Sequence, residues 1–239
     1  MDGQLVTPHS LPLWLDLGSI AIGAIYGATL ATARRAPLIG VFIVAVLMGV
    51  GGGMIRDILL GTDIAALVNP HYMQTMIIGA LLGAFFGHWL TKPKWIFPVL
   101  DSIVMALFVI IGTEKSFLYG MPIASSIFIG TLAAIGGSVL SDLLLGDRPA
   151  IMTRGPWNTS IALVSAIFLV ILLEQGLRTP AEILTILLSV LIRTMALWRG
   201  WSAPLAVSSI KQLLGKSHTD QLAAEREHQA RLLRSLVPR

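Results

Sequence analysis

Two segments of this chain carry the same pattern of residues at a constant offset of 85 positions, without a gap. Apolar stretches often match by accident, but aspartate, proline and glycine in register do not. The matched pairs are Leu15 and Leu100, Asp16 and Asp101, Gly27 and Gly112, Pro37 and Pro122, Gly51 and Gly136, Gly52 and Gly137, Asp57 and Asp142, and Gly61 and Gly146. A repeat of this length indicates that the fold is built from two similar halves.

The matched segments are apolar enough to lie in a membrane. Hydrophobic residues make up 55% of the 239 residues and charged residues only 13%, whereas soluble domains average about 25% charged residues. A helix needs about 20 apolar residues to cross the hydrocarbon core of a bilayer. Seven runs approach this length: 13–31, 37–60, 73–90, 96–112, 122–145, 157–173 and 181–198. The sequence therefore predicts an all-α integral membrane protein with seven transmembrane helices.

The duplication divides these helices into an inverted repeat. One copy covers about 12–90 and the other about 97–175, with three spans in each. Because three is odd, the second copy must enter the membrane from the opposite side. Such copies are related by a pseudo-two-fold axis in the membrane plane, which is typical of proteins that move solutes. The seventh helix, about 181–198, lies outside the duplication and is expected to brace it, completing a transmembrane domain over 1–200.

Lysine and arginine are distributed unequally between the two sides of this membrane domain. The first, third and fifth connections are rich in them, whereas the opposite side holds essentially Lys115 and Arg178, with Arg56 at a helix end. The residues of the rich side are Arg34, Arg35, Lys92, Lys94, Arg148 and Arg154. Positive residues favour the cytoplasmic side. We therefore predict a multi-pass protein of the cell (inner) membrane, with its N-terminus outside and its C-terminus cytoplasmic.

A polar tail follows the last helix over 201–239 and is predicted to be cytoplasmic. Its stretch DQLAAEREHQARLLRSL favours an amphipathic helix, which is either solvated, at the membrane surface, or bound to a partner. The final LVPR resembles the front half of a thrombin cleavage site and is interpreted as the remnant of a tag. The formal charge of +4 is attributed to residues that face lipid headgroups, so no nucleic acid partner is expected.

Glycines interrupt the second helix of each repeat at equivalent places. Gly51, Gly52 and Gly53 lie about 21 Å along a helix that begins at 37, past the midplane of the bilayer. Gly136 and Gly137 lie equally far along a helix that runs the other way. Glycine lowers helix propensity, so we expect a kink or local unwinding whose carbonyl groups line a path for a cation. The alternative is close packing of two helices, which small residues permit.

Polar residues follow both sets of glycines. They are Arg56 and Asp57 in the first copy, and Ser138, Ser141 and Asp142 in the second. Charged groups inside a membrane span usually face a cavity or a partner, so we expect these residues near opposite mouths of a path. The alternatives are an Arg56 that reaches the interface, or a structural Arg56–Asp57 pair. A second symmetric pair, Asp16 and Asp101, is expected to cap the first helix of each repeat, with contact to a solute as the alternative.

With its two inverted three-helix repeats, its seventh helix, and the paired motifs GGGMIRDILLG and IGGSVLSDLLLG, the chain resembles the prokaryotic trimeric intracellular cation (TRIC) channel family over about 12–200. The resemblance implies a homotrimer in membrane lipid, with one pore per protomer that conducts potassium and other monovalent cations such as sodium. It also implies that the kinked second and fifth helices line the pore. The pore residues carried over by motif are Gly51, Gly52, Gly53, Arg56, Asp57, Gly136, Gly137, Ser138, Ser141 and Asp142.

The chain departs from the family pattern at Ser141, where many relatives carry a second arginine. Losing a cation from one side of the path should make that side less hostile to positive ions. The main alternative function is a secondary transporter of a small solute such as glycine, because broken helices and acids suit an amino acid. The sequence contains no HExxH, GxSxG or phosphate-loop motif and no cysteine, so we expect no enzyme, no cofactor and no metal site beyond transient monovalent cations.

Overall fold

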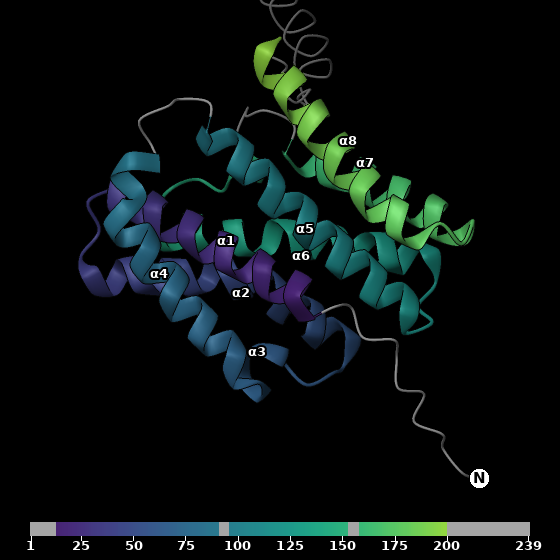
Figure 1. Cartoon of the computed structure of the whole chain (residues 1–239), viewed down its shortest axis with the longest axis horizontal. Coiled ribbons are helices and arrows are strands. Elements are labelled where there is room, and N and C mark those ends of the chain that lie inside the picture. Colours follow the sequence, from purple (N-terminus) through teal and green to yellow (C-terminus); the bar gives the residue numbers. More distant parts are fainter. Residues whose placement is uncertain (1–12, 91–95, 153–157, 200–239) are drawn as a thin grey trace, which may run out of the picture. The chain divides into compact units, whose positions relative to one another are not determined.

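The computed structural model describes residues 13–90, 96–152 and 158–199, and within these ranges the regular secondary structure is entirely helical (Figure 1). The helices are α1 (Leu13–Ala33), α2 (Leu38–Leu60), α3 (Ala65–Val68), α4 (Pro70–Leu90), α5 (Ile96–Leu118), α6 (Ile123–Leu144), the 3-10 turn η1 (Ala150–Met152), α7 (Asn158–Glu174) and α8 (Arg178–Trp198). The predicted all-helical fold is confirmed. By length and composition α1, α2 and α6 are clear candidates to cross a membrane, and the count of seven spans stays a prediction.

The duplication is visible in the backbone as well as in the sequence. Gly61 ends α2 at a φ of 65°, and Gly146 follows α6 at a φ of 74°. Glycine adopts this left-handed conformation at no steric cost, which is why it ends helices. The short elements α3 and η1 then begin at Ala65 and Ala150, again 85 positions apart. The sequence reading did not find these short elements, because they are too brief to show a period.

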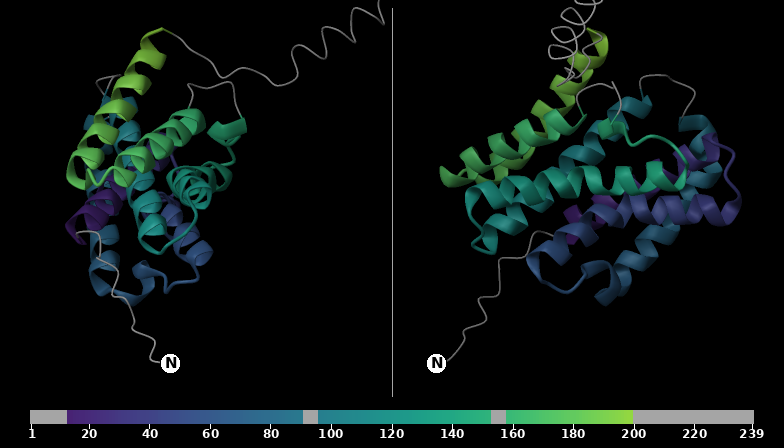
Figure 2. Two further views of the ribbon diagram at one scale, coloured as in Figure 1. Left: turned by 90° about the vertical axis from the view of Figure 1, so that its right-hand side faces the viewer. Right: turned by 180° about the vertical axis from the view of Figure 1, so that it is seen from behind.

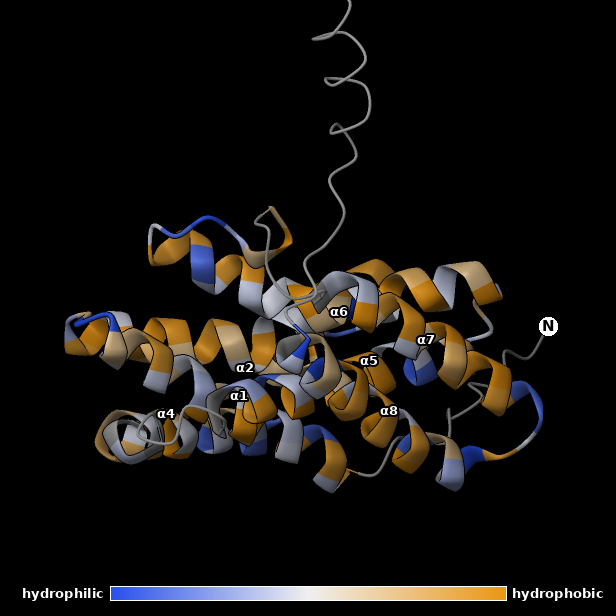
Figure 3. Ribbon diagram, turned by 90° about the horizontal axis from the view of Figure 1, so that it is seen from above, coloured by the Kyte–Doolittle hydropathy of each residue, from blue (hydrophilic) through white to orange (hydrophobic). Residues whose placement is uncertain are grey.

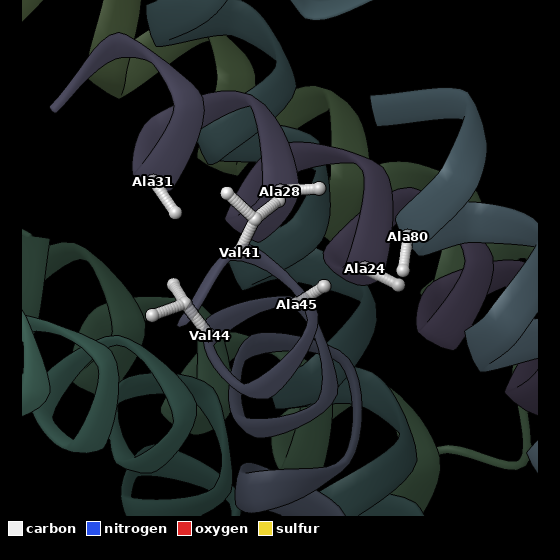
Figure 4. Packing of buried hydrophobic residues seen from close by; sticks show 7 residues of the cluster. All are labelled: Ala24, Ala28, Ala31, Val41, Val44, Ala45 and Ala80. Carbon is white, nitrogen blue, oxygen red and sulfur yellow. The ribbon is translucent and has the colours of Figure 1, made fainter. Parts of the chain in front are cut away.

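In the first half of the chain, α1 packs against both α2 and α4. Gly79, Gly83 and Gly87 form a stripe on α4 that lies directly against the backbone of α1; a Cβ atom at Gly87, for instance, would lie 3.1 Å from the Cα atom of Thr29. Small residues also fill the contact with α2, where a cluster of Ala24, Ala28, Ala31, Val41, Val44, Ala45 and Ala80 is buried (Figure 4). Such residues let membrane helices approach closely.

The second half replaces this stripe with an additional helix. The positions of the duplicate that correspond to the three glycines of α4 are Val164, Phe168 and Leu172. There α8 packs against both α5 and α7 (Figure 2), and a buried cluster of Ile110, Leu169 and Ala181 joins the three helices. The helix outside the duplication therefore braces the second repeat, as predicted.

Many large apolar side chains are exposed on these helices, and the ribbon coloured by hydropathy is hydrophobic along much of its length (Figure 3). Among the most exposed are Leu38, Ile39, Phe85, Trp89, Phe128, Leu187 and Leu191. An exposed apolar surface of this extent marks a membrane or protein contact. Together with the apolar α1, α2 and α6, it identifies a membrane protein.

Candidate functional site: two cavities related by the duplication

The glycines of α2 and α6 form the contact between these two helices. A Cβ atom at Gly52 would lie 3.0 Å from the carbonyl carbon of Ala133 and closer still to its oxygen, and one at Gly137 would lie 2.9 Å from the carbonyl oxygen of Met48. Both segments stay α-helical without interruption. The local unwinding that we expected is therefore wrong, and the kink stays a prediction. The close packing of two helices, given as the alternative, is confirmed by these short distances.

Two cavities lie along these helices. The first, here called the Asp16 cavity, is lined by Asp16, Ile20, Gly49, Val50, Gly53, Arg56, Asp57, Ala65, Ala66, Tyr72 and Phe108. The second, the Asp101 cavity, is lined by Met48, Asp101, Val104, Met105, Phe108, Ala134, Ile135, Gly137 and Ser138. They offer about 10 Å³ and about 20 Å³ of room for water, which is enough for roughly one molecule each.

The duplication relates the two cavities to each other. Five lining positions correspond at the offset of 85: Asp16 and Asp101, Ile20 and Met105, Gly49 and Ala134, Val50 and Ile135, and Gly53 and Ser138. Phe108 breaks the symmetry, because it is 4% exposed and lines both cavities. Its counterpart Gly23 is packed so closely on α2 that a Cβ atom there would lie 3.0 Å from the Cα atom of Gly49. Phe108 is thus a wall residue common to both cavities.

A network of four charged groups adjoins the Asp16 cavity, and three of them, Asp16, Arg56 and Asp57, line it. Arg56 Nε donates to Asp57 Oδ1 at 2.8 Å, and Lys115 Nζ donates to the same oxygen at 2.8 Å. Arg56 Nη1 also lies 3.9 Å from Asp16 Oδ1, while the hydroxyl of Tyr72 donates to Asp16. Arg56 and Asp57 are 2% and 1% exposed. Two acids and two bases balance, so the structural Arg56–Asp57 pair is confirmed, and an Arg56 that reaches the interface is wrong.

The Asp101 cavity is built differently. Arg193 Nη2, on α8, donates to Asp101 Oδ2 at 2.8 Å. The expectation that Asp101 caps the start of α5 is wrong, because it lies five residues after Ile96 and pairs with another helix. The hydroxyl of Ser138, beside it, donates to the carbonyl oxygen of Ile135 at 2.8 Å.

Asp57 and Asp142 share a structural task in the two repeats. Asp57 Oδ2 accepts a hydrogen bond from the backbone N–H of Ala65 at 3.1 Å, and Asp142 Oδ2 accepts one from that of Ala150 at 2.9 Å. Each carboxylate therefore fixes the start of α3 or η1. Asp57 adds two cationic partners, whereas within the described residues no lysine or arginine lies within ion-pair distance of Asp142.

The ten predicted site residues fall into four groups. Gly53, Arg56 and Asp57 line the Asp16 cavity, and Gly137 and Ser138 line the Asp101 cavity. Gly51, Gly52 and Gly136 face the opposing helix instead. Ser141 and Asp142 line neither of these two cavities, and in the described part of the chain the buried Ser141 hydroxyl has no hydrogen-bond partner.

Sequence reasoning missed four residues of the site: Tyr72 and Phe108, which line the cavities, and Lys115 and Arg193, which pair with Asp57 and Asp101. The repeat gave no signal for Phe108 and Lys115, because their counterparts are Gly23 and Leu30, and Arg193 lies outside it. Asp16 and Asp101 were visible as a symmetric pair but were assigned to helix capping. Among the described residues, no group of three His, Asp or Glu side chains could hold a metal ion.

Comparison with known proteins places these features in a family. A family model described as "Glycine transporter" matches residues 13–88 and 98–174, which are the two repeats. A UPF0126 membrane protein of Deinococcus radiodurans is 34% identical over 158 residues, covering 64% of this chain and 74% of that protein. The UPF0126 inner membrane protein YadS of Escherichia coli is 31% identical over 152 residues, covering 63% of this chain and 73% of YadS.

Solved structures show the same fold. The TRIC trimeric intracellular cation channel orthologue from Rhodobacter sphaeroides superposes with a TM-score of 0.73 at 29% identity, covering 79% of this chain and 98% of that one. A prokaryotic TRIC channel crystallised in 0.5 M KCl superposes with a TM-score of 0.71 at 24% identity, covering 79% of this chain and 96% of that one.

Proposed function

Because the chain belongs to the TRIC-like family that the glycine transporter model describes, we propose that it is a monovalent cation channel that is permeable to potassium. The observation that carries the proposal is the pair of cavities related by the duplication, which meet at Phe108. Two half-pathways that enter from opposite sides and share one wall are what an inverted repeat provides for a permeating solute.

The pathway we propose runs within one protomer, from the Asp16 cavity past Phe108 to the Asp101 cavity. The glycine-bearing α2 and α6 line it: Gly53 contributes a bare backbone on one side, and Gly137 and Ser138 contribute a backbone and a hydroxyl on the other. We propose Phe108 as the barrier of a closed state, because this buried side chain lines both cavities and each cavity has room for about one water. Opening requires the ring to leave the contact between the cavities.

The balance of charge supports permeation by cations. The four charged groups around Asp57 sum to zero, as do Asp101 and Arg193. Asp142 adds one negative charge to the Asp101 side. A second arginine at Ser141 would cancel that charge. Although Asp142 does not line the cavity, its field extends beyond its contacts, so the absence of an arginine favours positive ions on that side.

We further propose a homotrimer in the cell membrane, with one pore per protomer, by analogy with the trimeric channel of Rhodobacter sphaeroides. The N-terminus would lie outside and the C-terminus in the cytoplasm. An ion pair between Arg34 and Asp147 joins the first and fifth connections, which supports their lying on one side of the membrane. The excess of lysine and arginine in these connections is the reason to assign that side to the cytoplasm.

Single-channel recording in planar bilayers under a potassium chloride gradient tests the proposal. Wild-type protein should show discrete openings that reverse toward the potassium potential. Phe108→Ala should raise the ratio of open to closed time about tenfold. A buried phenylalanine contributes roughly 3–5 kcal/mol to the packed state, and losing about 1.4 kcal/mol of this on opening corresponds to a factor of ten. Phe128→Ala, the same change at a 59% exposed position on α6, is the matched control and should leave gating unchanged.

A secondary transporter of a small solute such as glycine is the second candidate, favoured by the description of the family model. Saturable glycine counterflow in liposomes, together with the absence of channel openings in planar bilayers, would favour the transporter and refute the channel. If Phe108→Ala and Phe128→Ala change the ratio of open to closed time equally in an active channel, the pore does not run through the two cavities.

A further inference from the structure

The two symmetric carboxylates obtain their positive partners from different sources. Asp16 lies 3.9 Å from Arg56, which belongs to the same repeat. The counterpart of Arg56 in the second repeat is Ser141, whose short side chain carries no charge. Asp101 instead receives its cation from Arg193, on the helix that the duplication does not include. The α8 helix therefore substitutes for a charge that the second repeat lacks.

The two members of the Asp101–Arg193 pair differ in their exposure and in whether they line the cavity. The Arg193 side chain is 6% exposed and is not among the residues that line the Asp101 cavity, while the Asp101 side chain is 22% exposed and lines it. The carboxylate can thus be reached from the cavity, whereas the guanidinium approaches it from α8. Gly137 and Ser138 line the same cavity as Asp101, so the cavity can supply hydroxyl oxygen as well as carboxylate to a cation.

We infer that Asp101 is a binding site for a monovalent cation in the pathway, and that Arg193 is a tethered cation which occupies its carboxylate in this conformation. The inference rests on the proposed function for its role in conduction. When α8 draws Arg193 away, a permeating cation replaces the guanidinium. The helix outside the duplication then controls how strongly the Asp101 cavity attracts cations.

Arg193→Gln tests the inference, because it removes the competing charge and keeps a hydrogen-bond donor. For one unit charge at roughly 10 Å and an effective dielectric constant of about 40, Coulomb's law gives about a fourfold change in local cation concentration. Single-channel conductance at limiting potassium should rise by about that factor. Arg193→Lys, which keeps the charge, should behave like the wild type.

Arg178→Gln is the matched control. Arg178 is also on α8 and also pairs with an acid of α5, Glu114, but neither residue lines the Asp101 cavity. A purely structural role for both ion pairs predicts that the two glutamine variants lose similar stability and leave the potassium dependence of conductance unchanged. That outcome would overturn the inference.

A binding measurement separates this inference from the proposed function. The thermal unfolding temperature of purified Arg193→Gln protein should rise when N-methylglucamine chloride is replaced by potassium chloride, since a bound ion stabilises the folded state. The rise should vanish in the Arg193→Gln, Asp101→Asn double variant. If the protein shows no channel openings in planar bilayers but this dependence of the unfolding temperature on potassium is seen, conduction is refuted and the cation site at Asp101 is supported.

Should Arg193→Gln fail to fold, Asp101→Asn alone decides. Loss of the carboxylate should lower conductance at limiting potassium by a similar factor of about four. An unchanged conductance would refute a cation site at Asp101.

Discussion

Two adjacent glycines on α2 should respond in opposite ways to the same substitution. For Gly52→Ala, the new methyl group would lie 3.0 Å from the carbonyl carbon of Ala133 on α6 and closer to its oxygen, whereas carbon atoms in contact prefer about 3.5–4.0 Å. For Gly53→Ala, the nearest atom is Arg56 Nη2 at 3.8 Å, an ordinary contact. Helix propensity alone would stabilise both variants by up to about 1 kcal/mol.

The magnitudes follow from these distances. The overlap at Gly52 involves backbone atoms, which cannot rotate away, so α2 and α6 must separate. Overpacking of this kind costs about 1–3 kcal/mol, which exceeds the gain in propensity. Because the overlap is with backbone, the upper part of this range applies, about 2–3 kcal/mol. After about 1 kcal/mol of propensity is subtracted, we expect Gly52→Ala to lower the free energy of unfolding by about 1–2 kcal/mol. We expect Gly53→Ala to be neutral or stabilising, while its methyl group narrows the Asp16 cavity and lowers conductance.

The assay is reversible unfolding of both variants in the same detergent or lipid, followed by helical circular dichroism, with conductance measured in parallel. Gly18→Ala serves as a further control, because nothing lies within 4 Å of its Cβ position. Equal stabilisation of Gly52→Ala and Gly53→Ala would refute the direct contact between α2 and α6 at Gly52. It would also remove the reason for which the glycines are present.

Two further predictions concern single charged residues. Lys115→Gln leaves the network around Asp57 with one net negative charge, so potassium conductance should rise at low ionic strength. This rise should disappear above about 0.5 M salt, because salt screens the charge. A fall in conductance would contradict the pairing of Lys115 with Asp57. Arg35 has a φ of 57°, which costs a residue with a side chain about 1–2 kcal/mol, so Arg35→Gly should stabilise the protein by up to that amount in thermal unfolding. Arg34→Gly, at the neighbouring position, should not stabilise it.

The amino-acid sequence by itself determined the helices, their division into two repeats, and the places where α2 and α6 meet. Long apolar runs must form helices in lipid, because only internal hydrogen bonds satisfy the backbone there. Glycine, proline and aspartate at a constant offset of 85 identified the duplication. The close approach of the glycines could also be anticipated as an alternative, since the absence of a side chain is a property of the residue itself.

The tertiary structure alone decided which side chains share a cavity. Lys115 reaches Asp57 from the other repeat, Arg193 reaches Asp101 from a helix outside both, and Phe108 closes a contact at which the first repeat has a glycine. These residues depart from the repeat or lie beyond it, so no periodicity in the chain marks them. Their partners follow from how the helices pack, because an ion pair or a shared wall depends on distances in space that no spacing along the chain encodes.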